Sequence, residues 1–553
     1  MDKNPLQMLF HWAETEPDRA YLHQPTNDVW TTYSYAEVAD QVRRMATALE
    51  GLGLPPGSAI GISGRNTAHW VMADLAIGMA GFVAVGMYPK QAAEHITYIL
   101  EHSEAKAVFV GPMPDVDEFM GALPQGIKTI TLPYEGVPKC DHDWDSLIKA
   151  SAPKQDYQVP EPDALMTLIY TSGTTGNPKG VMITYANMTF AAEGLMKTLP
   201  PQGQERLFSY LPLAHAFERG AVELASIYFG AEVFFLEDVD KLATQLAYVK
   251  PTRFFGVPLV YTRIQAGVLK KLPQKKLARL TSIPIIKGLI RKKILEGVGL
   301  NNARMCFSGA APLPIPLMEW YAKYLGINVL QGYGMTENSI YATVNRPDAH
   351  KRGSVGKEMP EANMKLSESG EILFKHPAVM AGYYKEPEKT KETFTEDGYL
   401  RTGDRGRIDD DGYLFITGRV KEIFKTLKGK YVAPAPIEGA LARNTDIDQL
   451  CFCGDGLMQP IMLTALTPDA MQKDRAAIEK QLTADIEAVN ATLEPHEKIA
   501  KCLIVKDAWT IDNNMMTPTM KVKRNQVEAR YGKLLASTAE DRSSKVALSL
   551  IHI

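Results

Sequence analysis

The sequence predicts an α/β protein. We expect a large N-terminal domain of layered α/β sheets with a β-subdomain, followed by a small, mobile α+β C-terminal domain. Short β-branched or aromatic segments alternate with longer segments of helical periodicity, and short hairpin-like segments follow from about residue 370. Beyond Arg419 the chain becomes more polar. Alternation of strands and helices is typical of layered folds with largely parallel sheets.

Individual elements follow from these patterns. The predicted strands lie within 58–63, 105–111, 165–173, 231–236 and 304–310. The predicted helices lie near 35–52, 66–80, 186–197, 216–229, 238–249, 314–325 and 473–490. Asp-Gly pairs at 397–398 and 411–412 predict tight turns between short strands. We expect domains at 1–419 and 420–537, and a disordered tail at 538–553, where no periodicity is visible.

Composition limits the class of protein. The chain has 553 residues, 45% of them hydrophobic, and a formal net charge of −3, which gives no indication of nucleic-acid binding. The N-terminus carries charges throughout, and no segment reaches the ~18 apolar residues that a membrane span needs. We therefore expect a cytoplasmic protein, and the oligomeric state is left open.

The five cysteines fit no zinc or disulfide framework. Cys451 and Cys453 are separated by one residue, and we expect them on opposite faces of a strand. Reduced, apolar cysteines are the favoured interpretation.

A glycine-rich loop gives the clearest local signal. Residues 170–181 read YTSGTTGNPKGV and follow an apolar, strand-like run. Glycines let a backbone approach an anion, while N–H groups, hydroxyls and Lys179 offer hydrogen bonds and charge to phosphate. A flexible surface turn is the alternative, disfavoured because the loop lies between a predicted buried strand and a helix. A Walker loop is excluded, because Pro178 precedes the lysine and Gly180 follows it.

The segment TSGTTGNPKG resembles the phosphate-binding signature of the adenylate-forming superfamily, which contains acyl-CoA synthetases, peptide-synthetase adenylation domains and luciferases. The other motifs of that superfamily follow in order. They are FSGAAPLP (307–314), GYGMTE (332–337), YLRTGD (399–404), Gly418-Arg419 and TPTMKVKRN (517–525). The resemblance covers nearly the whole chain except the tail, and it implies ATP, Mg²⁺ and coenzyme A as cofactors.

The resemblance implies a role for each motif residue, although each motif alone would also fit a turn, a packing contact or a solvated charge. The phosphate loop would comprise Thr171, Ser172, Gly173, Thr174, Thr175, Gly176 and Lys179. The adenine pocket would comprise Gly309, Ala310, Ala311, Gly332 and Tyr333. Thr336 would contact the α-phosphate, Glu337 would hold Mg²⁺, and Asp404 and Arg419 would bind the ribose.

Three positions concern the C-terminal domain. The Thr-x-x-x-Lys spacing selects Lys521, not Lys523, as the adenylation lysine, and Met520 before it is typical of the long-chain branch. Lys421 would be the hinge about which the C-terminal domain rotates. Gly429 would line the tunnel for the pantetheine of coenzyme A, unless it serves only as a turn that needs a positive φ.

Two segments indicate which carboxylic acid is the substrate. LPLAHAFERG (211–220) and VKPTRFFGVPLVYTRI (249–264) resemble the long-chain fatty acyl-CoA synthetases, in which His215 would lie by the carboxylate. A structural histidine is the alternative. The implied activity joins a medium- or long-chain fatty acid to coenzyme A through an acyl-AMP. An acyl-AMP ligase that loads a carrier protein, and an inactive lipid-binding scaffold, are the alternatives.

Residues 270–293 contain nine lysines and arginines and no acidic residue, with Leu and Ile between them. This pattern fits either a solvated helical face or a surface that docks on anionic lipid. In the second case the enzyme would be peripheral to the inner face of the membrane.

Overall fold

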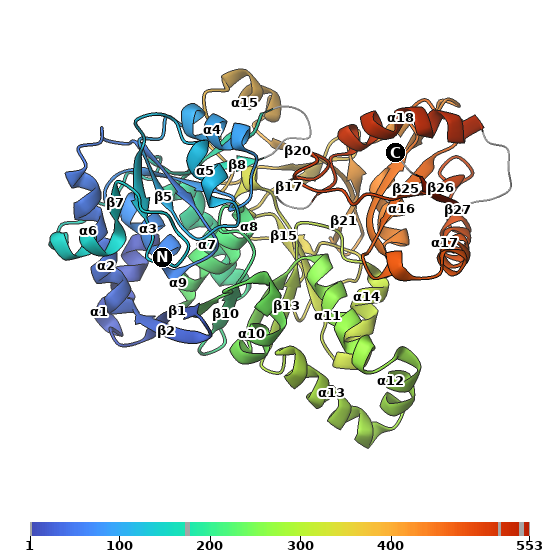
Figure 1. The fold of residues 1–553 in the computed structure, drawn as a ribbon, viewed down its shortest axis with the longest axis horizontal. Helices are drawn as coiled ribbons and strands as arrows, with labels where there is room; N and C mark the ends of the chain where they lie inside the picture. The colour runs from blue at the N-terminus through green and yellow to red at the C-terminus, as the bar shows by residue number, and fades with distance from the viewer. Residues whose placement is uncertain (1–2, 172–176, 518–520, 541–546, 552–553) are drawn as a thin grey trace.

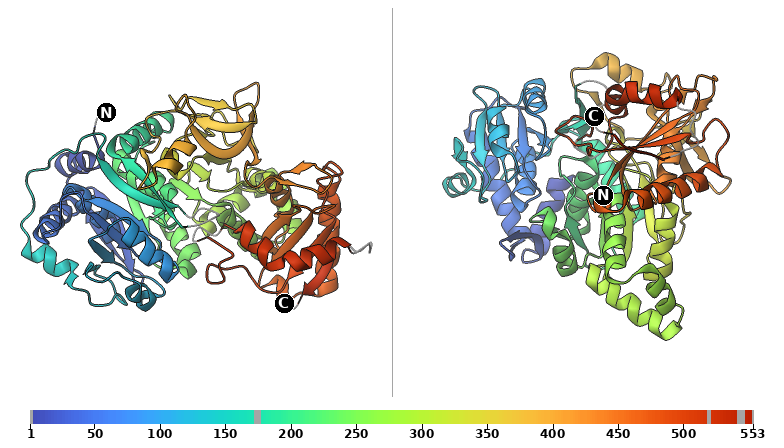
Figure 2. Two further views of the ribbon diagram at one scale, coloured as in Figure 1. Left: turned by 90° about the horizontal axis from the view of Figure 1, so that it is seen from above. Right: turned by 45° about the vertical axis from the view of Figure 1, so that its right-hand side comes forward.

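The computed structural model describes residues 3–171, 177–517, 521–540 and 547–551. A large N-terminal domain, blue to yellow in Figure 1, stands beside a smaller C-terminal domain in orange and red. The same separation is visible in both views of Figure 2. The strand β21 (Leu414–Arg419) ends at the predicted domain boundary. In the part of the chain that is described, no helix combines the length and apolarity needed to cross a bilayer.

The glycine-rich loop belongs to a mixed sheet with a parallel centre. β3 pairs in parallel with β4 and β5, β4 pairs in parallel with β8, and β9 turns back to pair antiparallel with β8. In spatial order the strands are β19 (Gly382–Tyr383), β9 (Lys179–Thr184), β8 (Leu165–Thr171), β4 (Val83–Met87), β3 (Ala59–Ser63), β5 (Ala107–Val110), β6 (Lys128–Thr131) and β7 (His142–Asp143). The central strands are buried along their length, as parallel sheets covered on both faces usually are.

A second sheet carries the motifs at 307–314 and 332–337. Its strands are β12 (Arg253–Gly256), β13 (Met305–Ser308), β14 (Val329–Tyr333), β15 (Thr343–Val344) and β16 (Lys357–Glu358). β12, β13 and β14 are parallel, so their carboxyl ends meet at one edge. A third sheet has the order β10 (Arg206–Ser209), β11 (Glu232–Phe235), β1 (Ala20–Thr26) and β2 (Val29–Ser34). All the predicted strands are confirmed.

Helices cover these sheets and lie between them. They include α1 (Pro5–Thr15), α2 (Tyr35–Gly51), α3 (Ala68–Met79), α4 (Ala93–His102), α5 (Val116–Gly121), α6 (Trp144–Ala150), α7 (Tyr185–Thr198), α10 (Leu242–Val249) and α11 (Pro258–Lys271). α3 is buried continuously from Ala68 to Ile77, as expected of a helix that is apolar on all sides.

Three predicted helices differ in detail from the prediction. The segment 238–249 divides into the 3₁₀ turn η2 (Val239–Lys241) and α10. The segment 216–229 divides into α8 (Ala216–Glu218), the π-helical turn η1 (Arg219–Leu224) and α9 (Ala225–Phe229). The segment 314–325 divides into α14 (Ile315–Trp320) and the π-helical turn η3 (Tyr321–Leu325). Within η1, buried Arg219 forms an ion pair with buried Asp74 of α3. A paired buried charge is one constraint that apolar periodicity does not reveal.

The β-subdomain contains the predicted hairpins. Its antiparallel strands are β17 (Met364–Leu366), β18 (Glu371–Phe374), β20 (Leu400–Ile408) and β21. Gly412 has φ +81° in the turn between β20 and β21, and Gly398 has φ +80° just before β20. Both predicted Asp-Gly turns are therefore confirmed. The helix α15 (Pro387–Thr393) lies between β19 and β20 in the chain.

The C-terminal domain surrounds a sheet of β24 (Ile447–Cys453), β25 (Ile461–Leu466), β26 (Lys501–Val505) and β27 (Ala547–Ile551). Its other elements are β22 (Phe424–Lys425), β23 (Tyr431–Val432), α16 (Pro434–Leu441), α17 (Arg475–Asn490) and α18 (Arg524–Glu540). α17 is the helix predicted at 473–490. The domain limits themselves remain a prediction.

Of the C-terminal tail after residue 537, the structure describes residues 538–540 and 547–551. α18 continues to Glu540, and β27 pairs in parallel with β26. The open edge of β26 offers backbone partners to this extended segment. The predicted disorder of the tail as a whole stays a prediction, because residues 541–546 and 552–553 lie outside the described residues.

The expected orientation of the two neighbouring cysteines is also corrected. The Sγ atoms of Cys451 and Cys453 lie 3.6 Å apart, and both thiols are buried. Residues i and i+2 of a strand share a face, so this spacing places both side chains on the same side of β24.

His376 is a buried, neutral histidine among aromatic rings. It lies against Phe190, Tyr341 and Phe374, and only 8% of its surface is exposed. Burial lowers its pKa from 6.5 to about 4. The unfolded chain therefore takes up a proton first as the pH falls, so the free energy of unfolding should decrease between pH 6.5 and 4.

We expect His376→Phe to reduce the dependence of the unfolding free energy on pH in this range by up to about 1.4 kcal/mol per pH unit. The substitution removes the titrating group and keeps an aromatic ring. Urea unfolding measured at pH 7, 6 and 5 tests this. An unchanged dependence on pH in the variant would show that other groups control acid stability.

Candidate active site

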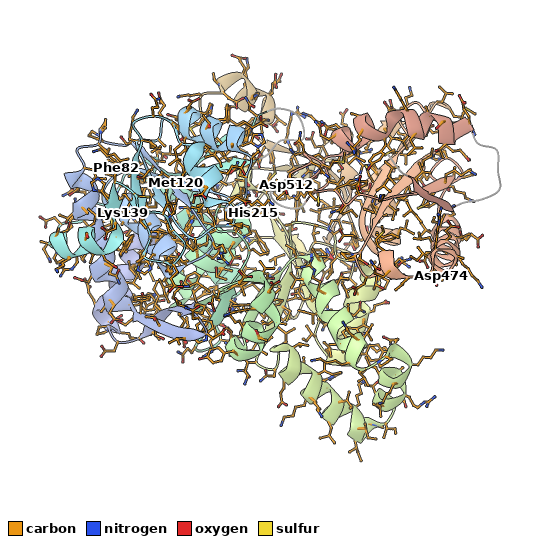
Figure 3. The ribbon with its side chains drawn as sticks, in the orientation of Figure 1. Phe82, Met120, Lys139, His215, Asp474 and Asp512 are labelled. Atoms are coloured by element: carbon orange, nitrogen blue, oxygen red, sulfur yellow. The ribbon has the colours of Figure 1, made fainter. Side chains whose placement is uncertain are left out.

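The predicted site residues come from several elements that meet between the two domains. The phosphate-loop hairpin, the carboxyl ends of β13 and β14, and the paired strands β20 and β21 contribute from the N-terminal domain. The lysine-bearing segment contributes from the C-terminal domain. Figure 3 labels His215 in the middle of the molecule, and Asp512 of the C-terminal domain, which forms an ion pair with Lys90 of the N-terminal domain.

The β8–β9 hairpin holds the two ends of the phosphate loop. Thr171 at the end of β8 lies opposite Lys179 at the start of β9. Ser172, Gly173, Thr174, Thr175 and Gly176 lie outside the described residues. The Lys179 ammonium lies 4.7 Å from the centre of the Tyr383 ring, close enough for a cation–π contact.

The predicted adenine residues follow two neighbouring parallel strands. Ala310 after β13 has φ +65°, a left-handed conformation that is uncommon for a residue with a side chain. A Cβ added to Gly309 would lie 3.4 Å from the Phe217 ring, so space there is limited. Gly332 and Tyr333 end β14. The structure thus gathers these residues at one sheet edge, as open α/β sheets commonly do at ligand sites.

Asp404 and Arg419 face each other across β20 and β21. The Arg419 Nε lies 3.1 Å from one Asp404 carboxylate oxygen, and the Tyr333 hydroxyl donates to the other at 2.6 Å. Only 6% of the surface of Asp404 is exposed. The structure therefore connects the predicted ribose pair directly to the predicted adenine-stacking ring.

Thr336 and Glu337 lie in the short 3₁₀ turn η4 (Thr336–Asn338) that follows β14. Thr336 is buried. The Tyr383 hydroxyl donates to Glu337 Oε1 at 2.8 Å, and the Met380 N–H donates to the Glu337 carbonyl at 2.9 Å. The carboxylate is thus held by a side chain that sequence reasoning did not single out.

His215 caps the N-terminus of α8 and is fixed by its neighbours. Its Nδ1 accepts from the Phe217 N–H at 3.1 Å, and the side-chain amide of Asn66 binds the backbone of the preceding loop at Leu211 and Leu213. Burial, with a contribution from nearby Lys521, lowers the pKa of His215 to about 4. The ring is therefore neutral at pH 7 and carries its proton on Nε2.

Lys521 reaches this site from the C-terminal domain. Thr517 closes its turn, because the Lys521 N–H donates to the Thr517 hydroxyl at 3.0 Å. The residue as a whole is exposed, but desolvation around its ammonium group, helped by Arg419, lowers its pKa. The carboxylates of Asp404, Glu422 and Glu337 act on it in the opposite direction.

Other contacts hold the C-terminal domain in this arrangement. Lys90 forms an ion pair with Asp512 at 3.1 Å, and the carboxylate of Glu94 attracts the Lys523 ammonium. These contacts lie beside the segment that bears Lys521, so they stabilise its approach to the N-terminal domain.

Two predicted positions stay outside this cluster. Lys421 is exposed in the turn after β21, and Gly429 is exposed between β22 and β23. Gly429 has φ +75°, and a Cβ there would meet only Lys425 Cε, at 3.8 Å. The turn explanation for this glycine is therefore supported by its backbone, while the tunnel role remains a prediction.

Sequence reasoning missed Tyr383, Asn66 and Glu422. Tyr383 is one of 23 tyrosines and lies 46 residues from its partner Glu337, so no local pattern marks it. Asn66 is detectable only as a polar residue that follows a buried strand, at the edge where ligand sites are common.

Comparison with known proteins agrees with this geometry. A family model described as an AMP-binding enzyme matches residues 9–384, and one described as the AMP-binding enzyme C-terminal domain matches residues 422–542. The chain is 31% identical to the long-chain-fatty-acid–CoA ligase FadD15 of Mycobacterium bovis, over 96% of each chain. It is 30% identical to the peroxisomal long chain acyl-CoA synthetase 6 of Arabidopsis thaliana, over 92% of this chain and 81% of that one.

Solved structures show the same fold. The adenylation domain of a carboxylate reductase from Mycobacterium chelonae has a TM-score of 0.81 at 20% identity, over 98% of this chain and 92% of that one. ATP-bound MatB from Rhodopseudomonas palustris has a TM-score of 0.76 at 22% identity, over 96% of this chain and 100% of that one. The chain therefore belongs to the AMP-binding enzyme family of adenylate-forming enzymes, in its long-chain acyl-CoA synthetase branch.

Proposed function

We propose that this chain is an ATP-dependent fatty acid–CoA ligase that activates a medium- or long-chain fatty acid as an acyl-AMP and transfers the acyl group to coenzyme A. The main support is the approach of Lys521 to Glu337, Asp404 and His215 across the domain boundary. The names of the curated relatives, which are long-chain fatty acid ligases, support the same substrate class.

The residues fit a magnesium ion bound with ATP. Among the residues that the structure describes, no group of three or more His, Cys, Asp or Glu side chains is arranged for a metal. Mg²⁺ is usually held by one or two carboxylates together with nucleotide phosphates and water, so Glu337 alone is a sufficient protein ligand. Bound there, the ion would neutralise phosphate charge and order the phosphate groups.

In the first step, a carboxylate oxygen of the fatty acid attacks the α-phosphorus of ATP. The new C–O–P linkage forms as the bond to the bridging oxygen of pyrophosphate breaks. The acid is already ionised at neutral pH, so no base is required. Lys521 and Thr336 would stabilise the charge that develops on the α-phosphate, and Lys179 would bind the outer phosphates. His215, neutral and with its proton on Nε2, would donate to the substrate carboxyl group.

In the second step, the sulfur of coenzyme A attacks the acyl carbon and AMP leaves, while the thiol proton is released. We propose that the C-terminal domain rotates about Lys421 between the steps, which withdraws Lys521 and brings the Gly429 turn to the acyl-AMP. The carrier-protein ligase and the inactive scaffold are not favoured, because the curated relatives are CoA ligases and every charged motif position is filled.

Lys521→Ala should reduce acyl-AMP formation by at least 10²–10³-fold, because one charge contact in the transition state is lost. Thioester formation from supplied oleoyl-AMP should remain. Pyrophosphate release and thioester formation, measured separately, test this. Equal loss in both half-reactions would contradict the proposed role of the lysine.

The role of Gly429 is tested by comparing a small and a large substituent, because any L-residue there is strained at φ +75°. Gly429→Ala and Gly429→Leu share this strain, and the open surroundings accommodate both side chains in the present arrangement. If Gly429 lines the pantetheine tunnel, the leucine variant should lose thioester formation far more than the alanine variant, with acyl-AMP formation equal in the two. Equal loss in both variants would leave only the turn role.

We also propose that residues 270–293 dock on an anionic membrane. α12 (Gln274–Thr281) and α13 (Pro284–Val298) project from the body of the N-terminal domain (Figure 1). Ile283, Ile285 and Leu289 are 48%, 82% and 67% exposed near the start of α13. Exposed apolar side chains among basic residues favour a lipid surface over a merely solvated face. The cytoplasmic location remains a prediction.

Two variants of this helical pair should separate the contributions to binding. Neutralising Lys275, Lys276, Lys292 and Lys293 should weaken binding to phosphatidylglycerol vesicles by about fivefold for each lysine, or about 1 kcal/mol each. Ile285→Ser with Leu289→Ser should weaken it further at high salt. Val29→Ser, at a position that is 69% exposed on the distant strand β2, serves as the control. The proposal is refuted if the wild-type protein does not bind these vesicles.

A further inference from the structure

Tyr383 connects two parts of the candidate site that are far apart in the sequence. It ends the short strand β19, where it pairs with Val181 of β9, and its side chain is buried. Its hydroxyl donates to Glu337 Oε1 at 2.8 Å, and its ring centre lies 4.7 Å from the Lys179 ammonium. One side chain therefore touches both the carboxylate proposed to hold Mg²⁺ and the lysine proposed to bind phosphate.

The backbone around Tyr383 is anchored on both sides. The Tyr383 N–H donates to the Thr390 hydroxyl at 2.9 Å, and the Ala381 N–H donates to the Met182 carbonyl of β9 at 3.0 Å. The Met380 N–H donates to the Glu337 carbonyl. The segment 380–383 is thus fastened to β9 and to the η4 turn at once, which gives the ring a fixed place relative to both.

The chemistry of the hydrogen bond explains what this arrangement can do. A carboxylate has two oxygens, and a single donor on Oε1 fixes the plane of the group while Oε2 stays available. Groups that orient a metal ligand in this way commonly affect metal affinity by 10–100-fold. The aromatic face, in turn, attracts the Lys179 ammonium and restricts where it can lie.

We propose that Tyr383 is a positioning residue for the nucleotide's metal and phosphates: its hydroxyl orients Glu337 toward Mg²⁺, and its ring holds Lys179 beside the phosphate loop. This inference rests on the proposed function of the same site. It assigns the two contacts to different parts of one side chain, so they can be removed separately.

The test uses the full chain with Tyr383→Phe, which removes the hydroxyl and keeps the ring. The matched control is Tyr384→Phe, because the neighbouring Tyr384 hydroxyl donates to exposed Glu104 at 3.1 Å instead of to the site. Equilibrium binding of ATP is measured with Mg²⁺ and in EDTA. Pyrophosphate release with oleate is measured across a range of Mg²⁺ concentrations.

We expect Tyr383→Phe to raise the Mg²⁺ concentration for half-maximal pyrophosphate release by about tenfold and to leave ATP binding in EDTA unchanged. Thioester formation from supplied oleoyl-AMP should also be unchanged. Tyr383→Leu, which removes the ring as well, should weaken ATP binding in EDTA too. Tyr384→Phe should match the wild type in all of these measurements.

The proposal is overturned if Tyr383→Phe has the wild-type Mg²⁺ dependence, or if it weakens ATP binding equally with and without Mg²⁺. A lower melting temperature with equal loss in both half-reactions would assign Tyr383 a merely structural role and would also overturn it. If the wild type itself forms no acyl-AMP, the proposed function fails. The ratio of ATP affinities with and without Mg²⁺ still decides the role of Tyr383 in that case.

Discussion

The antiparallel pairing of β9 with β8, at the end of an otherwise parallel run of strands, positions much of the candidate site. This pairing sets Thr171 against Lys179 and so fixes both ends of the phosphate loop. The free edge of β9 then accepts β19, which carries Tyr383 to within hydrogen-bond distance of Glu337. A shift of this register by one residue would turn Lys179 and Tyr383 to the opposite faces of the sheet, so the buried faces of β8 and β9 also protect the site geometry.

Charge balance is the second constraint on the site. Lys521 and Arg419 repel each other, and desolvation further disfavours the lysine cation. Asp404, Glu422 and Glu337 offset part of these effects without ATP, and the pKa of Lys521 stays lowered. A nucleotide would add negative charge at the same place, so the docked arrangement of the C-terminal domain should be stabilised further when ATP is bound. The exposed Lys90–Asp512 ion pair contributes little by itself, because such pairs are typically worth no more than about 1 kcal/mol.

The positions of the strands and of the motifs could be predicted from the sequence, because both depend on residues that are neighbours in the chain. Apolar runs become the buried strands β5 (Ala107–Val110) and β8 (Leu165–Thr171), and the loops that follow parallel strands meet at one sheet edge. The Asp404–Arg419 pair was also implied by motifs, although its cross-strand geometry was not. The contact between Tyr383 and Glu337 was missed because it depends on how β19 docks on β9. The pairing of β27 with β26 depends in the same way on tertiary contacts, and the misjudged cysteine pair reflects the period of two in a strand.

In the proposed mechanism, Lys521 and Gly429 would act in different arrangements of the C-terminal domain. Both belong to the C-terminal domain, yet the ammonium of Lys521 is in the site while the Gly429 turn faces solvent. Leu427 and Tyr431, which flank that turn, are each 65% exposed. Under the proposed mechanism, rotation of the domain would cover them against the N-terminal domain as Lys521 leaves. Burial of this apolar surface would then favour the second arrangement once pyrophosphate, and the negative charge that attracts Lys521, has left the site.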